Sequence, residues 1–318
     1  IERATARAID GWPVGDEIAL ADLGQQITLD VIMAAIFGIG DARVPTEAEE
    51  DLRFQIVRLL HRSTWPIATA AQLINARNPE PVGLTRWALA PVDRAVYRVI
   101  AGRRGAGGGD DILSVLLDAR DEAGGALSDD EIRDELMTLV LAGHETTSNT
   151  LAWTFERLTR HRGQYLRIRD EVRADGGADA VEALINESMR VRPVVPIVAR
   201  ELTVPWDFGG HHIPAGTVAL VSILLLHHRD DVYARPFAFD TERFVQTRPS
   251  PQTLMPFGGG NRRCLGAALA MAELRTVVTE ILRRVDVETH ERPGEKPRHR
   301  NVTMIPGEGG KVRALRKQ

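Results

Sequence analysis

The stretch FGGGNRRCLG, residues 257–266, holds the only cysteine of the 318-residue chain, Cys264. Three glycines precede it, and glycine lets the backbone approach a flat or bulky partner closely. Arg262 and Arg263 add positive charge beside the thiol. We expect a helix to start at the cysteine, where the helix dipole and the N-terminal amides favour a thiolate. A lone cysteine is most often a small buried hydrophobic residue, so it is the surroundings that indicate chemistry.

Three kinds of chemistry use a cysteine in such surroundings. A catalytic nucleophile needs a histidine as its base, and none lies nearby in the sequence, although the fold could supply one. A zinc site needs further cysteine or histidine ligands at suitable spacing, which are absent. A thiolate ligand to a haem iron needs one cysteine, with cations for the haem carboxylates. The third interpretation explains most features of the stretch.

The stretch resembles the FxxGxRxCxG signature of the cytochrome P-450 family of haem-thiolate monooxygenases. The signature positions are Phe257, Gly260, Arg262, Cys264 and Gly266. Three further segments resemble motifs of this family, in the order that the family requires: AGHETT (142–147), ESMR (187–190) and TERF (241–244). The resemblance implies a partial cytochrome P-450 fold of bacterial type. This fold is mainly α with a minor β portion, and a long central helix crosses the haem-thiolate loop.

The resemblance also implies a domain organisation. Residues 1–318 are expected to form one cytochrome P-450-type domain that lacks the family's N-terminal sheet and first helices. Residues 1–190 should be mostly helical. Residues 191–318 should mix strands and loops with the haem-binding loop and the helix that follows it.

The resemblance assigns a cofactor, haem b, whose iron takes Cys264 as its axial thiolate ligand. Arg200 and Arg262 would hold the haem propionates, although a surface arginine is the alternative for both, and more so for Arg200. The implied cofactor-binding set is Phe257, Gly260, Arg262, Cys264, Gly266, Arg200, Ala142 and Gly143.

The segment AGHETT lies midway along the predicted long helix. Glu145 and Thr146 resemble the acid–alcohol pair with which the family relays protons. Beside the small residues Ala142 and Gly143, a disturbed helix ladder would open a groove for dioxygen and water. From the residues alone, Thr146 and Thr147 could instead bond to carbonyls one turn earlier and merely bend the helix.

Two further groups of residues take their roles from the resemblance. Glu187 and Arg190 share a helix face and would form a buried structural network with Arg243 that holds the cysteine loop. The alternative is a solvated surface pair, which contributes little to stability. The extended segment after this helix would line an apolar substrate pocket with Val194, Val195, Ile197 and Val198.

These assignments predict a monooxygenase that hydroxylates or epoxidises an apolar organic molecule with dioxygen. No GxGxxG follows a predicted strand, so electrons must come from elsewhere. The resemblance implies a ferredoxin or flavodoxin with its NAD(P)H reductase. Arg263 would face outward, where an acidic redox protein could dock. The alternative is a truncated, inactive relative or a haem-based module that only binds a ligand.

Composition agrees with a soluble globular protein, because 43% of the residues are hydrophobic and 26% charged. The formal charge of −4 argues against nucleic acid as a partner. A single cysteine fits a reducing compartment, and we expect a cytoplasmic monomer. The nearest candidate for a membrane span, IPAGTVALVSILLLHH (213–228), is too short and is broken by Pro214 and Gly216.

The elements that must position these residues follow from hydrophobic spacing and capping signals. A capping box at Ser128 and Glu131 should start the long helix, which runs to about His161. Further helices are predicted at 23–37, 47–62 and 110–124, before Arg190, and after Cys264. Non-helical segments are predicted as a glycine-rich connector at 102–109, a small sheet at 204–224 and a hairpin at 301–315.

Overall fold

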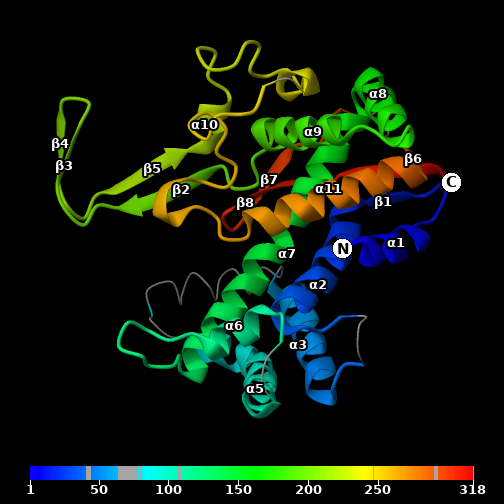
Figure 1. Ribbon diagram of the computed structural model, residues 1–318. Coiled ribbons are helices and arrows are strands. Elements are labelled where there is room, and N and C mark those ends of the chain that lie inside the picture. The colour runs from blue at the N-terminus through cyan, green and yellow to red at the C-terminus, as the bar shows by residue number, and fades with distance from the viewer. Residues whose placement is uncertain are drawn as a thin grey trace. The chain divides into compact units, whose positions relative to one another are not determined.

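The computed structural model describes residues 1–40, 44–63, 78, 81–106, 109–245, 247–289 and 293–317. It divides into two compact units, which are described separately. One unit comprises Ile1–Ile27 with Glu145–Gln318, and the other comprises Thr28–His144. The boundaries fall inside two helices, α2 (Leu20–Phe37) and α7 (Asp129–Thr159) (Figure 1).

The unit Thr28–His144 is helical. Its helices are α3 (Glu47–Ser63), α5 (Gly83–Ala106) and α6 (Ile112–Asp118), together with parts of α2 and α7. Their apolar faces meet in one buried cluster that includes Met33, Phe37, Leu52, Ile56 and Ile100. The helices predicted at 23–37 and 47–62 are therefore confirmed. The helix predicted at 110–124 is confirmed only in its first half, because α6 ends at Asp118 and residues 119–124 form a turn in which Arg120 bridges to Ala126.

The long helix α7 begins as predicted. The backbone N–H of Ser128 donates to the Glu131 carboxylate at 2.8 Å, and the N–H of Glu131 donates to Ser128 Oγ at 3.2 Å. This reciprocal capping satisfies donors that the first helical turn leaves without partners. The helix then runs without interruption to Thr159.

The glycine-rich connector at 102–109 was predicted too early in the chain. Helix α5 continues through Gly102 and Gly105 to Ala106, while residues 107 and 108 lie outside the described residues. Arg103 explains the extra turn, because its guanidinium donates to the Phe37 carbonyl at 3.2 Å and pairs with Asp111. These contacts outweigh the low helix propensity of glycine.

In the other unit, α1 (Glu2–Asp10), α8 (Arg162–Arg173) and α9 (Ala178–Val191) each pack against α11 (Ala267–Arg284) (Figure 1). The predicted apolar face of α11 is buried, from Leu274 to Leu282. Two predicted boundaries need correction. The helix predicted before Arg190 is preceded by a separate helix, α8, because the chain turns at Gly177 with a φ of +78°.

The second correction concerns the start of α11. The helix begins at Ala267, three residues after the cysteine, with Gly266 as its N-cap. The backbone N–H of Cys264 instead donates to the Phe257 carbonyl at 2.9 Å, and Gly260–Arg262 forms a single 3₁₀ turn, η2. The cysteine therefore belongs to the loop and not to the helix.

All strands of this unit pair in antiparallel fashion. A three-stranded sheet has the order β1-β9-β6, with β1 (Glu17–Ala19), β6 (Val285–Glu288) and β9 (Lys311–Lys317). The strands predicted at 204–224 are present, but they belong to two separate two-stranded sheets, and one of these includes a strand that precedes the predicted range. These sheets are β2 (Ile197–Glu201) with β5 (Val218–Ser222), and β3 (Trp206–Phe208) with β4 (His211–Ile213).

The hairpin predicted at 301–315 is wrong. Strand β8 (Thr303–Pro306) pairs with β7 (Pro297–Arg300), which precedes it, and β9 belongs to the other sheet. Glu295 explains why the glycine turn does not close a hairpin. Its buried carboxylate accepts the backbone N–H groups of Glu308, Gly310 and Lys311 and so turns the chain away from β8.

Among the described helices, α2 is long and apolar enough to cross a membrane by length and composition. The sequence-based expectation had placed the nearest candidate elsewhere, in the segment of β5 and α10 (Ile223–His227). Because 67% of the α2 window is buried inside the protein, and core helices of soluble proteins pass the same test, this is weak support for a membrane span.

Candidate functional site

The loop that carries Cys264 is shaped by backbone hydrogen bonds. Gly258 and Gly260 have φ values of +68° and +65°, which side chains rarely adopt. The Gly258 N–H donates to the Met255 carbonyl at 3.0 Å, and the Cys264 N–H donates to the Phe257 carbonyl. The Cys264 side chain is exposed. The thiol therefore stands on the outside of a tightly closed turn.

The surface around this thiol fits a flat group such as haem. A Cβ atom placed on Gly258, Gly260 or Gly266 would meet no atom within 4 Å. The side chains of Arg262 and Leu265 are also exposed, Leu265 to 87%. The glycines would thus allow close approach by a planar group that the thiol binds, and the arginine would supply a cation for an acidic substituent.

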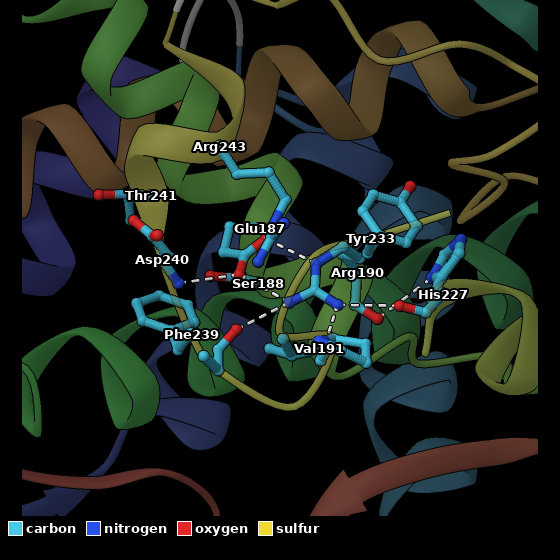
Figure 2. Close-up of polar contacts among 12 residues, drawn as sticks. Glu187, Ser188, Arg190, Val191, His227, Tyr233, Phe239, Asp240, Thr241 and Arg243 are labelled. Atoms are coloured by element: carbon cyan, nitrogen blue, oxygen red, sulfur yellow. Dashed lines mark hydrogen bonds and ion pairs between the residues drawn. The ribbon is translucent and has the colours of Figure 1, made fainter. Parts of the chain in front are cut away.

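The Glu187–Arg190 pair lies at the centre of a buried network (Figure 2). Both side chains are completely buried. The Arg190 guanidinium has five N–H groups, and all of them donate at 2.7–2.9 Å. Two go to the Glu187 carboxylate, and three go to the carbonyls of His227, Pro236 and Ala238. The pair is buried, and not the solvated surface bridge of the alternative.

Two other elements meet Glu187. The backbone N–H of Asp240 donates to its Oε1 at 2.8 Å, just before the 3₁₀ helix η1 (Thr241–Phe244). The Nε of Arg243, within η1, lies 3.4 Å from Glu187 Oε2. The structure thus brings together the three residues of the predicted network. Figure 2 shows Arg190 and Arg243 on either side of the Glu187 carboxylate, with Tyr233 close by.

Glu145 contacts two residues that sequence reasoning missed. Its Oε1 lies 3.3 Å from Arg300 Nη1 and 3.3 Å from the hydroxyl of Thr303, which both come from the β7–β8 hairpin. The Glu145 and Thr146 carbonyls also accept side-chain bonds, from Asn149 and Thr150 respectively. No motif pointed to these contacts, because they join segments far apart in the sequence.

The side chain of Thr147 contacts a second helix. Its hydroxyl bonds to Glu273, a buried residue of α11 that sequence reasoning also missed. Burial raises the pKa of the Glu273 carboxyl to about 7, against a lowering contribution from the Thr147 hydroxyl. Glu273 Oε1 has no hydrogen-bond partner in the described part of the chain. The environment thus favours the neutral acid.

The remaining predicted residues are placed as follows. Ala142 and Gly143 lie on α7 in the unit Thr28–His144, where the Cβ position of Gly143 is 3.0 Å from Ile32 Cδ1. Arg200 is exposed on β2 and donates to the Ala199 carbonyl at 2.7 Å, and its pairing with a propionate stays a prediction.

The four predicted pocket residues differ in exposure. Val194 is buried and its carbonyl accepts the Met304 N–H, whereas Ile197 is 48% exposed on β2. Val195 and Val198 are half-buried. Their lining of one pocket therefore stays a prediction.

Comparison with known proteins identifies the family of this chain. The cytochrome P450 family model matches residues 14–312. The chain is 36% identical to "Putative cytochrome P450 135B1" of Mycobacterium bovis, over 98% of the chain and 67% of that relative. It is 39% identical to "Putative cytochrome P450 137" of Mycobacterium tuberculosis, over 98% of the chain and 66% of that relative. The chain therefore belongs to the cytochrome P450 family, a family of haem monooxygenases.

Solved structures confirm the predicted fold class. The haem domain of cytochrome P450DA matches with a TM-score of 0.76 and 26% identity, over 99% of this chain and 72% of that one. The retinoic acid-bound cyanobacterial CYP120A1 matches with a TM-score of 0.79 at 24% identity, over 100% of this chain and 73% of that one, and shows the fold alone. The chain thus spans about two thirds to three quarters of the length of these relatives.

Proposed function

We propose that this chain carries the haem-thiolate site of a monooxygenase that inserts one atom of dioxygen into an apolar organic molecule. The observation that supports this most is the exposed Cys264 thiol on a glycine loop with open space beside it. Haem with a thiolate ligand supplies the cleavage of the O–O bond. The chain's own residues hold the group, shape the space beside it and deliver protons.

Several residues would hold the haem. Cys264 provides the thiolate sulfur, while Gly260 and Gly266 keep the loop thin enough for close approach. Arg262 carries an exposed guanidinium two residues before the ligand and would pair with a propionate. Arg200 is the second candidate for that pairing, and Phe257 fixes the loop through its carbonyl bond to Cys264.

Glu145 and Thr146 would move protons toward the bound oxygen. The Glu145 carboxylate is only partly buried, and Arg300 and the Thr303 hydroxyl hold its Oε1 in place, which leaves Oε2 as the oxygen that would take part in a relay. Thr146 follows it on α7 and offers a hydroxyl as the next proton carrier. One turn earlier on α7, Ala142 carries only a methyl group and Gly143 has no side chain, which would leave room for dioxygen.

The substrate class and the electron source also belong to the proposal. Val194, Val195, Ile197 and Val198 are apolar, which favours a hydrophobic substrate. Electrons would come from a ferredoxin or flavodoxin with its NAD(P)H reductase, and the exposed Arg263 offers a cation for an acidic partner. We further propose that the protein acts as a monomer in the cytoplasm.

The decisive test is the spectrum of the full-length, haem-loaded protein after reduction in carbon monoxide. We expect a thiolate-type Soret band that disappears in Cys264→Ser, because a hydroxyl does not donate charge as a thiolate does. Arg263→Ser serves as the control, since it changes a neighbouring surface residue. A band that persists unchanged in Cys264→Ala would overturn the assignment.

A further inference from the structure

His227, the last residue of α10, joins two parts of the site that are far apart in the sequence. Its side chain is completely buried. Its Nε2 lies 2.9 Å from the backbone N of Met255, and its Nδ1 lies 3.2 Å from the Arg190 carbonyl. A backbone N–H can only donate, so Nε2 must accept and the ring hydrogen must lie on Nδ1. Both ring nitrogens are therefore occupied by bonds of defined direction.

The contact with Arg190 is reciprocal. The His227 ring donates to the Arg190 carbonyl, while Arg190 Nη1 donates to the His227 carbonyl at 2.8 Å. Figure 2 shows the His227 ring beyond Arg190, on the side away from Glu187. The histidine is thus fixed to the buried network by its ring and by its backbone.

Tyr233 contacts the segment that contains Met255, at a point two residues earlier in the chain. Its hydroxyl donates to the Thr253 carbonyl at 2.9 Å, and its ring lies beneath the guanidinium groups of Arg190 and Arg243, at 5.0 and 5.6 Å. Leu254, between the two contact points, is buried in one apolar cluster with Tyr233. We call His227 and Tyr233 the loop clamp, because they fix three consecutive residues at the entrance to the cysteine loop.

Hydrogen bonds continue from the loop clamp to the backbone of Cys264. The Met255 N–H is held by His227, and the Met255 carbonyl accepts the Gly258 N–H at 3.0 Å. The Phe257 carbonyl, within that turn, accepts the Cys264 N–H at 2.9 Å. A series of hydrogen bonds therefore links the His227 side chain to the backbone of Cys264, so the position of this backbone depends on His227.

We propose that His227 is a positioning residue that sets the place of the Cys264 loop relative to the buried Glu187–Arg190 network. The inference rests on the proposed role of Cys264 as the haem ligand. The role requires a neutral imidazole, since a protonated ring would present a donor to the Met255 donor. Burial lowers the pKa of His227 to about 4, which keeps the ring neutral at physiological pH.

The competing explanation is a core histidine that merely fills space. That explanation predicts that the size and shape of the residue substituted for His227 matter, whereas its ability to accept the Met255 N–H does not. Glutamine and asparagine separate the two explanations. The glutamine oxygen reaches about as far as Nε2 and can accept the Met255 N–H, whereas the asparagine side chain is one bond shorter and stops near the position of Nδ1.

The experiment uses the full-length, haem-loaded protein with His227→Gln, His227→Asn and His227→Leu. The neighbouring, half-buried His228→Leu is the matched control. The first readout is the share of total haem that gives the thiolate-type Soret band in carbon monoxide. The second is deuterium exchange at the Met255 amide.

We expect His227→Gln and the control to keep the band, and His227→Asn and His227→Leu to lose most of it. Exchange at Met255 should be about tenfold or more faster in the Asn variant, because a buried donor loses its partner.

Equal thiolate shares in the Gln and Asn variants, whether both high or both low, overturn the inference even if His227→Leu fails to fold. Rapid exchange of the Met255 amide in the unsubstituted protein overturns it as well. If the unsubstituted protein lacks the thiolate-type band, the proposed function fails and this inference fails with it. The two failures are therefore distinguishable.

Discussion

Glu187 on α9 and Glu273 on α11 are both buried glutamates of the same unit, yet their surroundings are opposite. Glu187 accepts two bonds from Arg190 and one from the Asp240 N–H, and it pairs with Arg243. Glu273 bonds to one threonine hydroxyl and leaves one oxygen without a partner in the described residues. The first site is built for a charged pair, and the second favours a neutral acid.

The difference indicates two roles for a buried glutamate: Glu187 anchors the fold, and Glu273 can exchange a proton. A buried ion pair is costly to form, but removing one partner is far more costly, so such a pair persists as a fixed point. A buried acid that titrates near neutral pH can gain or lose a proton under ordinary conditions. The Glu187–Arg190 network, which anchors the cysteine loop, is such a fixed point. The contact between Thr147 of α7 and Glu273 of α11, next to Glu145 and Thr146 in the sequence, is a site where a proton can be gained or lost.

The largest expected effect comes from breaking the charged pair. Glu187→Ala leaves Arg190 and Arg243 buried without their anion, which should cost about 3–5 kcal/mol. We expect insoluble or haem-free protein, measured by soluble yield and by urea unfolding. Glu182→Ala is the matched control, since Glu182 lies on the same helix in an exposed bridge with Arg275. Equal stability of the two variants would show that the network does not anchor the fold.

A pH-dependent effect is expected from Glu273. Its pKa is raised from 4.5 to about 7 in the folded protein, so the folded state binds more protons than the unfolded state between these values. Stability should therefore fall as pH rises from 4.5 through 7, by about 3 kcal/mol at most. Glu273→Gln should remove that fall and be the more stable protein above pH 7, but not near pH 4.

The measurement for Glu273 is urea unfolding as a function of pH. Glu280→Gln on the same helix is the control, because Glu280 pairs with Arg283 outside the core. Parallel stability curves for Glu273→Gln and the unsubstituted protein would mean that Glu273 is ionised in the fold. The contrast with Glu187 would then disappear.

The smallest effect on stability is expected at Thr146. Thr146→Ala should leave the free energy of unfolding within about 0.5 kcal/mol, while product formed per electron consumed falls and oxygen consumption continues. The assay needs the full-length protein with redox partners. Thr150→Ala, which removes a hydroxyl bonded to the Thr146 carbonyl, is the control. A Thr146→Ala protein that stays fully coupled would remove Thr146 from the proton path.

The parts of this structure that depend on local motifs could be predicted from the sequence, and the parts that depend on long-range contacts could not. The signature around Cys264 and the spacing of Glu187 and Arg190 could be read directly, because both depend on neighbouring residues. The partners of His227 and Glu273 could not, since Met255 and Thr147 reach them only after the chain has folded. The predicted hairpin failed for the same reason, because Glu295 redirects the turn through contacts that no periodic pattern reveals.

The bonding of Arg190 also bears on protein engineering. The chain leaves the network at Val191 and returns to it at His227, and the arm between these points carries the paired strands β2 to β5 (Figure 1). Its outer turn, at Gly209 and Gly210, has φ values of +59° and +80° with open space around both residues. A segment tied down at both ends and exposed at its tip tolerates insertions there. This turn is therefore a practical attachment point for a tag or a fused domain, since lengthening it leaves the anchoring contacts of the cysteine loop in place.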